Sequence, residues 1–310
     1  MPKPLPKKYR TTNWRDYNQS LIRRGSLLLW IDKDMDWFAP ASGKRGRSET
    51  FTDAAVQFCL MVKNLFGLAL RQASGMVASL LKLSNLDWPA PNYTTLCRRQ
   101  QYLQVSIPYR PNPNGLHLLV DSTGVKMLGE GEWKTKKHGA EYRRQWRKVH
   151  LAIDAETLEI RAIEVTSNRV GDAQALPDML NQIPRDERID SISGDGAYDT
   201  KNVYSATADR GAEAIIPVRK NGKPWKDNTS GAQARNETLR AVQRLGRAIW
   251  KKWSGYHRRS LVETKMRCFK LLGERVNARI FNSQVAELQI RAVLLNRFTQ
   301  LGTPITVVTP

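Results

Sequence analysis

The segment from Gly255 to Lys270 constrains this chain most, because as a helix it separates apolar from charged side chains. At about 100° per residue, five polar side chains fall on one narrow stripe: Tyr256, Arg259, Glu263, Arg267 and Lys270. The opposite side is apolar and carries Leu261, Val262, Cys268, Phe269 and Leu272. The segment is therefore expected to pack one face on a core and to turn a lone carboxylate outward among cations. A merely solvated polar face is the alternative.

The polar stripe has the spacing Y-x2-R-x3-E-x6-K, formed by Tyr256, Arg259, Glu263 and Lys270. This spacing resembles the C-terminal signature of bacterial insertion-sequence transposases with an Asp-Asp-Glu (DDE) triad. The resemblance implies an RNase H-like catalytic domain. It also implies two further carboxylates, on or at the end of buried strands, that share metal ions with Glu263.

Two upstream acids meet that requirement. Asp121 lies within the apolar run Leu116–Gly124, where a carboxylate is costly unless a cation or hydrogen bonds compensate it. Asp195 ends a short strand between Gly194 and Gly196, which allow close approach of backbone or ligand. The Asp-Ser-Thr-Gly and Asp-Gly-Ala-Tyr runs also look like the segments around the family's first two acids. Taken alone, each acid could instead be a strand-end or turn residue satisfied by backbone donors.

Three rival acids have structural explanations. Asp154 stands between two strand-like runs and is predicted to be a hairpin turn residue. Asp172 and Asp199 stand just before helical patterns and are predicted to be N-caps. The predicted catalytic and metal-binding residues are therefore Asp121, Asp195 and Glu263.

The resemblance also implies a chemistry. Carboxylates select hard cations, so Mg²⁺ is the expected cofactor and Mn²⁺ is expected to substitute for it. Water would free a 3′-hydroxyl at each transposon end, and this hydroxyl would then attack target DNA. Tyr256, Arg259 and Lys270 would hold phosphates of the end, with Arg267 on the same stripe. A nuclease that releases cut DNA without joining it, and a DNA-binding regulator that needs no acids, are the rival functions.

Composition agrees with a double-stranded DNA partner. The chain has 310 residues, and 50 Lys and Arg against 29 Asp and Glu give a net charge of +21. Such a balance is typical of proteins that displace counterions from phosphates. The three cysteines lack metal-binding spacing, and no apolar run is long enough to span a membrane. We expect a cytoplasmic, nucleoid-associated bacterial protein that forms a homo-oligomer in a synaptic complex on transposon ends.

The Pro- and Asn-rich stretch Pro108–Gly115 predicts a domain boundary. Residues 1–110 are expected to form a small all-helical domain of helix-turn-helix type that binds transposon ends, and residues 115–302 the catalytic domain. The third helix of the first domain begins near Asn92 or Thr94 and supplies Arg98 and Arg99 to DNA. A generic helical bundle is the alternative.

From residue 115 onward the pattern is α/β. Strands are predicted at about 116–128, 148–154, 159–166, 188–194 and 213–218, with helices near 173–182 and 200–210. Residues 219–250 form an irregular and then helical insertion before the helix of Glu263. This order matches the RNase H-like fold that the resemblance implies, a mixed sheet flanked by helices.

The segment Trp133–His150 lies between the first two predicted strands and interleaves basic and aromatic residues. Cations bind phosphates and aromatic faces stack on unpaired bases, so Trp133, Arg143, Arg144 and Trp146 are predicted DNA contacts. A charged hairpin rim is the alternative. Lys265, about 160° from Glu263 on the helix, lies off the polar stripe and is expected to matter little for catalysis.

Overall fold

A computed structural model describes residues 8–26, 31, 33–41, 43, 45–46, 48–127 and 146–309 of the chain. Its central sheet runs in the order β4 (Ile160–Ser167), β3 (Trp146–Asp154), β2 (Leu116–Met127), β5 (Ile189–Ser193) and β6 (Glu213–Ile215). β2, β3 and β4 follow one another in the sequence, and each pairs antiparallel with the next. β5 and β6 run parallel to β2. This strand order is that of an RNase H-like fold, so the predicted mixed α/β sheet is confirmed.

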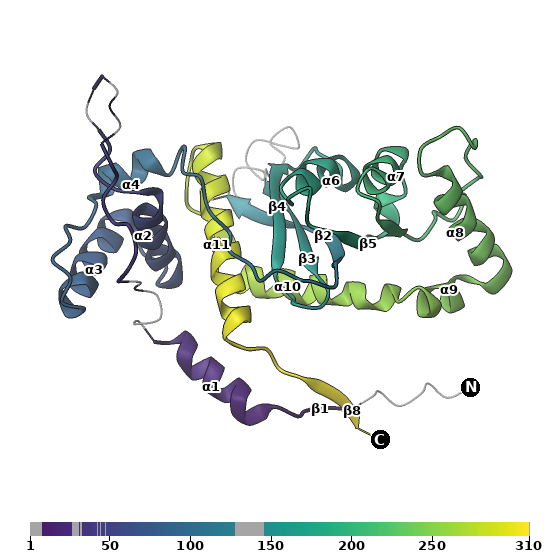
Figure 1. Cartoon of the computed structure of the whole chain (residues 1–310), viewed down its shortest axis with the longest axis horizontal. Helices are drawn as coiled ribbons and strands as arrows, with labels where there is room; N and C mark the ends of the chain where they lie inside the picture. Colours follow the sequence, from purple (N-terminus) through teal and green to yellow (C-terminus); the bar gives the residue numbers. More distant parts are fainter. Residues whose placement is uncertain are drawn as a thin grey trace, which may run out of the picture.

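Helices cover both faces of the sheet (Figure 1). One face packs on α6 (Asp172–Asn181) and α7 (Lys201–Ala208), and the other on α10 (Ser260–Leu271) and α11 (Phe281–Leu301). Successive side chains of a strand point to opposite faces. In β2, Leu118 and Val120 join the core under α6, while Leu119 joins the core under α10.

Three helices precede the sheet: α2 (Asp53–Leu65), α3 (Leu70–Leu83) and α4 (Tyr93–Arg99). The side chains of Thr52 and Asn92 accept hydrogen bonds from backbone N–H groups at the starts of α2 and α4, as good N-caps do. The core of these helices also contains Ile290 and Leu294 of α11. The helical region and the sheet thus share one long helix, and a fragment ending at residue 110 would lack that part of its core.

The two ends of the described chain meet in a way that the sequence did not indicate. β1 (Lys8–Thr11) pairs antiparallel with β8 (Thr306–Thr309), and α1 (Trp14–Arg24) lies beside the last turns of α11 (Figure 1). Arg24 Nη2 donates to the carbonyl of Gly302 at 2.8 Å. The N-terminal arm is therefore held by the C-terminal segment.

The segment before α10 is helical, as predicted. It contains α8 (Ala232–Leu245), α9 (Arg247–Trp253) and the 3-10 turn η3 (Tyr256–Arg259), and Figure 1 places α8 and α9 at the end of the molecule away from α2–α4. A short strand, β7 (Arg275–Val276), pairs with the end of β2, and a 3-10 turn, η2 (Gly196–Tyr198), follows β5. Of these elements, α8, α9 and η3 carry the chain from β6 to the helix of Glu263.

The rival acids have structural roles, although two differ from those predicted. Asp154 is buried in the β3–β4 hairpin and accepts a hydrogen bond from Thr157 N at 2.9 Å, which confirms its turn role. Asp172 is the first residue of α6, after the N-cap Gly171. Asp199 pairs with Arg235 at 3.1 Å, and Thr200 caps α7 instead. The N-cap predictions for Asp172 and Asp199 were therefore wrong by one position.

No single helix in the described part of the chain is long and apolar enough to cross a membrane. Only α2 and α3 taken together pass a test of length and composition, and the two are bent by 109°.

Two side-chain amides complete the outer edge of β4. Gln182 bonds both main-chain groups of Ile163, through Ile163 N at 3.0 Å and Ile163 O at 3.1 Å. Asn296 of α11 does the same for Ile160, with Ile160 N at 2.7 Å and Ile160 O at 2.9 Å. In the part of the chain that the structure describes, these groups have no neighbouring strand on that side, and a buried polar group without a partner is costly.

We expect Asn296→Ala to lower the free energy of unfolding by about 2 to 4 kcal/mol, because it strands the N–H and C=O of Ile160. The neighbouring exposed Arg297→Ala should change it by less than about 0.5 kcal/mol. Urea unfolding of the full chain measures both. Equal midpoints for the two variants would contradict the role of Asn296.

Candidate active site

The parallel pairing of β2 and β5 sets two carboxylates level with each other. Leu119 of β2 lies opposite Ser193, the last residue of β5, and an acid follows two residues further along the chain in each case: Asp121 within β2 and Asp195 just after β5. Gly194 precedes Asp195 because a Cβ there would lie 2.8 Å from the ring of Tyr198. Asp195 Oδ1 accepts a hydrogen bond from Ala197 N at 2.8 Å, which fixes its side chain above the strand end.

Asp121 is a half-buried carboxylate whose pKa is raised by its surroundings. Its side chain is 19% exposed, and burial raises its pKa. The charges of Asp195 and Glu263 raise it further, whereas the N–H of Ser122, at 2.8 Å, and the charge of Arg259 lower it. Two like charges thus act on Asp121, and a cation beside it stabilises its charged form.

Glu263 reaches the site from α10. Val262, Met266 and Phe269 bury the opposite face of this helix, so Glu263 is left 60% exposed. The predicted single helix from Tyr256 is wrong in its first turn, because η3 precedes α10 and α10 begins at Ser260. Gly255, with a φ of 69°, provides the left-handed turn into η3.

Arg259 joins two of the three acids. Its Nη1 donates to Asp121 Oδ2 at 2.8 Å and to Glu263 Oε1 at 3.1 Å, and its Nε donates to the hydroxyl of Tyr256 at 3.2 Å. The Arg259 side chain is only 15% exposed. The sequence predicted an outward-facing arginine, and the structure corrects this, since the 3-10 turn directs the guanidinium inward.

The remaining stripe residues keep the predicted exposure. Arg267 and Lys270 are exposed on α10, and Tyr256 is partly exposed with Lys251 Nζ 5.1 Å from the centre of its ring. The site therefore combines a carboxylate centre with a cationic rim on one side of the molecule.

Two family models, each described as Transposase DDE domain, match residues 112–297 and residues 22–130. The first of these ranges covers more than half of the chain. The chain belongs to the DDE transposase family. It is thus a DNA transposase, an enzyme that cleaves DNA and transfers strands.

One solved structure with similarity to the transposase is the cryo-EM structure of the simian T-cell lymphotropic virus intasome in complex with PP2A regulatory subunit B56 gamma. The two chains are 14% identical, and the match covers 71% of this chain and 67% of that chain with a TM-score of 0.26. A superposition this loose carries no argument about function.

DDE transposases depend on divalent metal ions, and the donor chemistry of this site fits one. Within residues 48–127 and 146–309 and the other described segments, no three His, Cys, Asp or Glu side chains are arranged to hold a metal ion. Asp121 Oδ2 and Glu263 Oε1 instead share Arg259 Nη1. Carboxylate oxygens are ligands for hard cations, and the space between these two already attracts positive charge. The residues fit a divalent ion once the guanidinium leaves.

A second polar cluster, not predicted from the sequence, lies beside Asp121. In the strand pairing Ser122 lies opposite His150 of β3, and Lys148 Nζ pairs with Asp172 Oδ1 at 2.7 Å. Burial lowers the pKa of His150 to about 4, so the ring is neutral near pH 7. The alternation of Lys148 and His150 on one strand was the available signal, but only the sheet brings Asp172 to them.

The predicted aromatic and basic contacts of the β2–β3 connection are largely outside the described residues, which include neither Trp133 nor Arg143 nor Arg144. Trp146, at the start of β3, is 41% exposed. A Cβ on Gly124 would lie 3.1 Å from its ring, so Trp146 packs across the strand on a position without a side chain.

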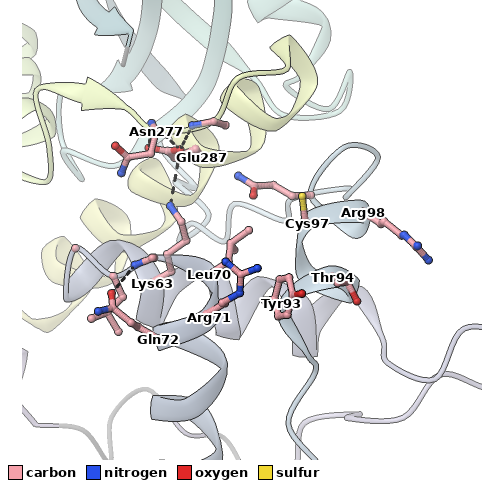
Figure 2. Close-up of a pocket in the computed structure, with 15 residues that line it drawn as sticks. Lys63, Leu70, Arg71, Gln72, Tyr93, Thr94, Cys97, Arg98, Asn277 and Glu287 are labelled. Atoms are coloured by element: carbon pink, nitrogen blue, oxygen red, sulfur yellow. Dashed lines mark hydrogen bonds and ion pairs between the residues drawn. The ribbon is translucent and has the colours of Figure 1, made fainter. Parts of the chain in front are cut away.

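The two arginines of α4 differ in their surroundings. Arg98 is exposed and lines a pocket of about 790 Å³ between α4, the α2–α3 turn and the start of α11 (Figure 2). Arg99 is 5% exposed and bonds Asp53 at 2.6 Å and the carbonyl of Phe51 at 2.7 Å. The prediction that Arg99 contacts DNA is corrected, because its guanidinium secures the start of α2.

Lys265 lies off the polar stripe as predicted, but it is a structural residue. Its Nζ donates to Thr299 Oγ1 at 2.8 Å, and burial lowers its pKa from 10.5 to about 8. Replacing Lys265 would therefore disturb the α10–α11 packing, and exposed residues make better controls for the charge of the stripe.

The free energy of unfolding of the transposase should increase as the pH rises from about 8 to 10.5. In this range Lys265 is neutral in the folded chain, whereas in the unfolded chain it still binds a proton. Lys265→Met should remove this part of the rise. Urea unfolding of both proteins at pH values across that window measures the difference. Identical pH dependence would show that the folded chain keeps Lys265 charged.

Proposed function

We propose that this transposase binds the terminal inverted repeats of an insertion sequence, hydrolyses the DNA at each end and joins the freed 3′-hydroxyl to target DNA. The observation that supports this most is the convergence of Asp121, Asp195 and Glu263 from β2, the end of β5 and α10. Two further carboxylates close enough to raise the pKa of the half-buried Asp121, on a chain of net charge +21, are best explained by cation binding.

In this proposal, Asp121, Asp195 and Glu263 bind Mg²⁺, for which Mn²⁺ can substitute. When bound, the ions activate the attacking oxygen and stabilise the leaving oxygen of a phosphodiester. The chain itself fixes the geometry. The register of β2 and β5 holds Asp121 and Asp195 level, and the buried face of α10 sets the height of Glu263.

The cationic rim holds the DNA. Lys270 and Arg267 extend from the exposed side of α10, and Tyr256 and Arg259 stand on η3, directly before this helix. Trp146, at the exposed start of β3, is proposed as a further DNA contact. Phosphate contacts of this kind position DNA without reading its sequence.

We further propose that residues 1–110 recognise the terminal repeat through α4. This helix presents the exposed residues Tyr93, Thr94 and Arg98, and Arg71 of α3 stacks on the Tyr93 ring at 4.2 Å. An insertion sequence has two ends, whereas the described chain carries one set of carboxylates. Cutting both ends in one complex therefore calls for at least two copies of the chain.

Asp121→Asn, Asp195→Asn and Glu263→Gln should each reduce cleavage at least about 1,000-fold while end binding changes less than about threefold, because the amide keeps the shape but loses the charge that binds metal. Labelled end DNA, Mg²⁺ and a supercoiled target measure binding, cleavage and joining together. Cleavage like that of the wild type in any variant removes that residue from the site.

The same assay separates the rival functions. Cut ends that never join the target would identify a nuclease, and specific binding without any cut would identify a regulator. Transposition is supported if the wild type joins the ends to the target and the three carboxylate variants do not.

Lys270→Ala should lower cleavage and make end binding less dependent on salt, by about one unit of slope for one lost phosphate contact. Exposed charges contribute little to folding, so the melting temperature should stay within a few degrees. Lys252→Ala, an exposed lysine of α9 outside the stripe, is the matched control. Equal losses from both variants would mean that only bulk charge matters.

A further inference from the structure

Arg259 occupies the place where the proposed function puts a metal ion. A single nitrogen, Nη1, bonds one oxygen of Asp121 at 2.8 Å and one of Glu263 at 3.1 Å. The guanidinium is held there by its third contact, with the hydroxyl of Tyr256 at 3.2 Å. Hydrogen bonds between charged partners are among the stronger ones, so this arrangement is a defined state of the chain.

The guanidinium and a metal ion cannot use these oxygens together. Asp121 Oδ2 and Glu263 Oε1 face Arg259 from a strand and a helix, and a cation bound by both would lie where Nη1 lies. Once displaced, Arg259 is a cation without its two anions, beside the exposed Arg267 and Lys270. A DNA phosphate at this rim would replace what Arg259 has lost.

We infer that Arg259 is a positioning residue that exchanges between two sets of anions, and this inference rests on the proposed function. In the free transposase Arg259 binds the two carboxylates, and in the DNA complex it binds a DNA phosphate. DNA that takes up Arg259 frees the carboxylates for metal, and metal that takes the carboxylates frees Arg259 for DNA. Each ligand therefore strengthens the binding of the other, and the coupling is reciprocal. The free enzyme holds metal weakly until an end is bound.

The expected change in metal affinity follows from the fraction of time that the guanidinium of Arg259 occupies the carboxylates. If the guanidinium leaves the carboxylates only about a tenth of the time, metal affinity is reduced about tenfold. Removing the guanidinium should restore it. A purely structural arginine predicts the opposite, because losing it would loosen α10 and weaken the metal site.

The test is titration calorimetry of the full chain with Mg²⁺ alone, without DNA. Arg259→Gln should bind Mg²⁺ about ten times more tightly than the wild type, and Arg259→Lys, which keeps one charge but not the fork, should lie between them. Arg258→Ala removes the same charge from the adjacent exposed position, which lines a separate cavity with His117 and Ser191, and should bind like the wild type.

A second titration repeats the measurement with a saturating duplex that carries the transposon end already cut, so that no bond remains to be hydrolysed. The duplex should raise Mg²⁺ affinity in the wild type about tenfold and much less in Arg259→Gln. Thermal melting without metal checks that each variant is folded, and Arg259→Lys serves if Arg259→Gln is not.

The inference is overturned if folded Arg259→Gln binds Mg²⁺ no more tightly than the wild type, or if Arg258→Ala gains as much. Failure of the proposed function looks different. In that case Asp121→Asn would still bind Mg²⁺ or cut DNA, whatever the result for Arg259.

Discussion

The architecture depends on one helix that is buried almost all round. α11 contributes Leu288 and Leu295 to the core under the sheet, and Ile290 and Leu294 to the core of α2–α4. Apolar burial on both sides of one helix thus joins the core of α2–α4 to the core under the sheet. Its polar residues are equally committed, as Glu287 accepts hydrogen bonds from the backbone of Asn277 and pairs with Arg291. The surface that carries Arg98 and the carboxylate centre are therefore held by one element.

The active site depends on a second constraint, the free-energy cost of keeping the half-buried carboxylate of Asp121 charged within the sheet. The charge of Asp121 is costly where it stands, and the N–H of Ser122 and the guanidinium of Arg259 reduce that cost, as would divalent metal in the proposed mechanism. A site that must be electrostatically satisfied both with and without metal needs a cation of its own that can move away. An arginine on a short 3-10 turn, hydrogen-bonded to a tyrosine, meets that need.

Local pattern predicted most of the sheet. Apolar runs, turn residues and the helical spacing after Ser260 were enough, because β2 to β6 and α10 each bury one face or both. The position of Asp121 and Asp195 at one level was beyond that pattern, since it depends on the pairing of Leu119 with Ser193. The direction in which a helical side chain points was still harder to predict. Arg98 and Arg99 are adjacent, yet one is exposed and the other is buried against Asp53, because one residue turns a helix by about 100°. The pairing of β1 with β8 joins two four-residue strands from opposite ends of the sequence, and neither is distinctive by itself.

The amides of Gln182 and Asn296 also bear on how copies of this protein behave at high concentration. A sheet normally ends in a row of free N–H and C=O groups that can recruit a strand from another molecule. On β4, Ile160 and Ile163 have both of those groups occupied by side chains of the same chain. An incoming strand would have to displace both amides, of which that of Asn296 is fully buried, before it gained a hydrogen bond at these two residues. The fold thus guards its outer strand against edge-to-edge aggregation, and it leaves contacts between copies to surfaces other than this edge.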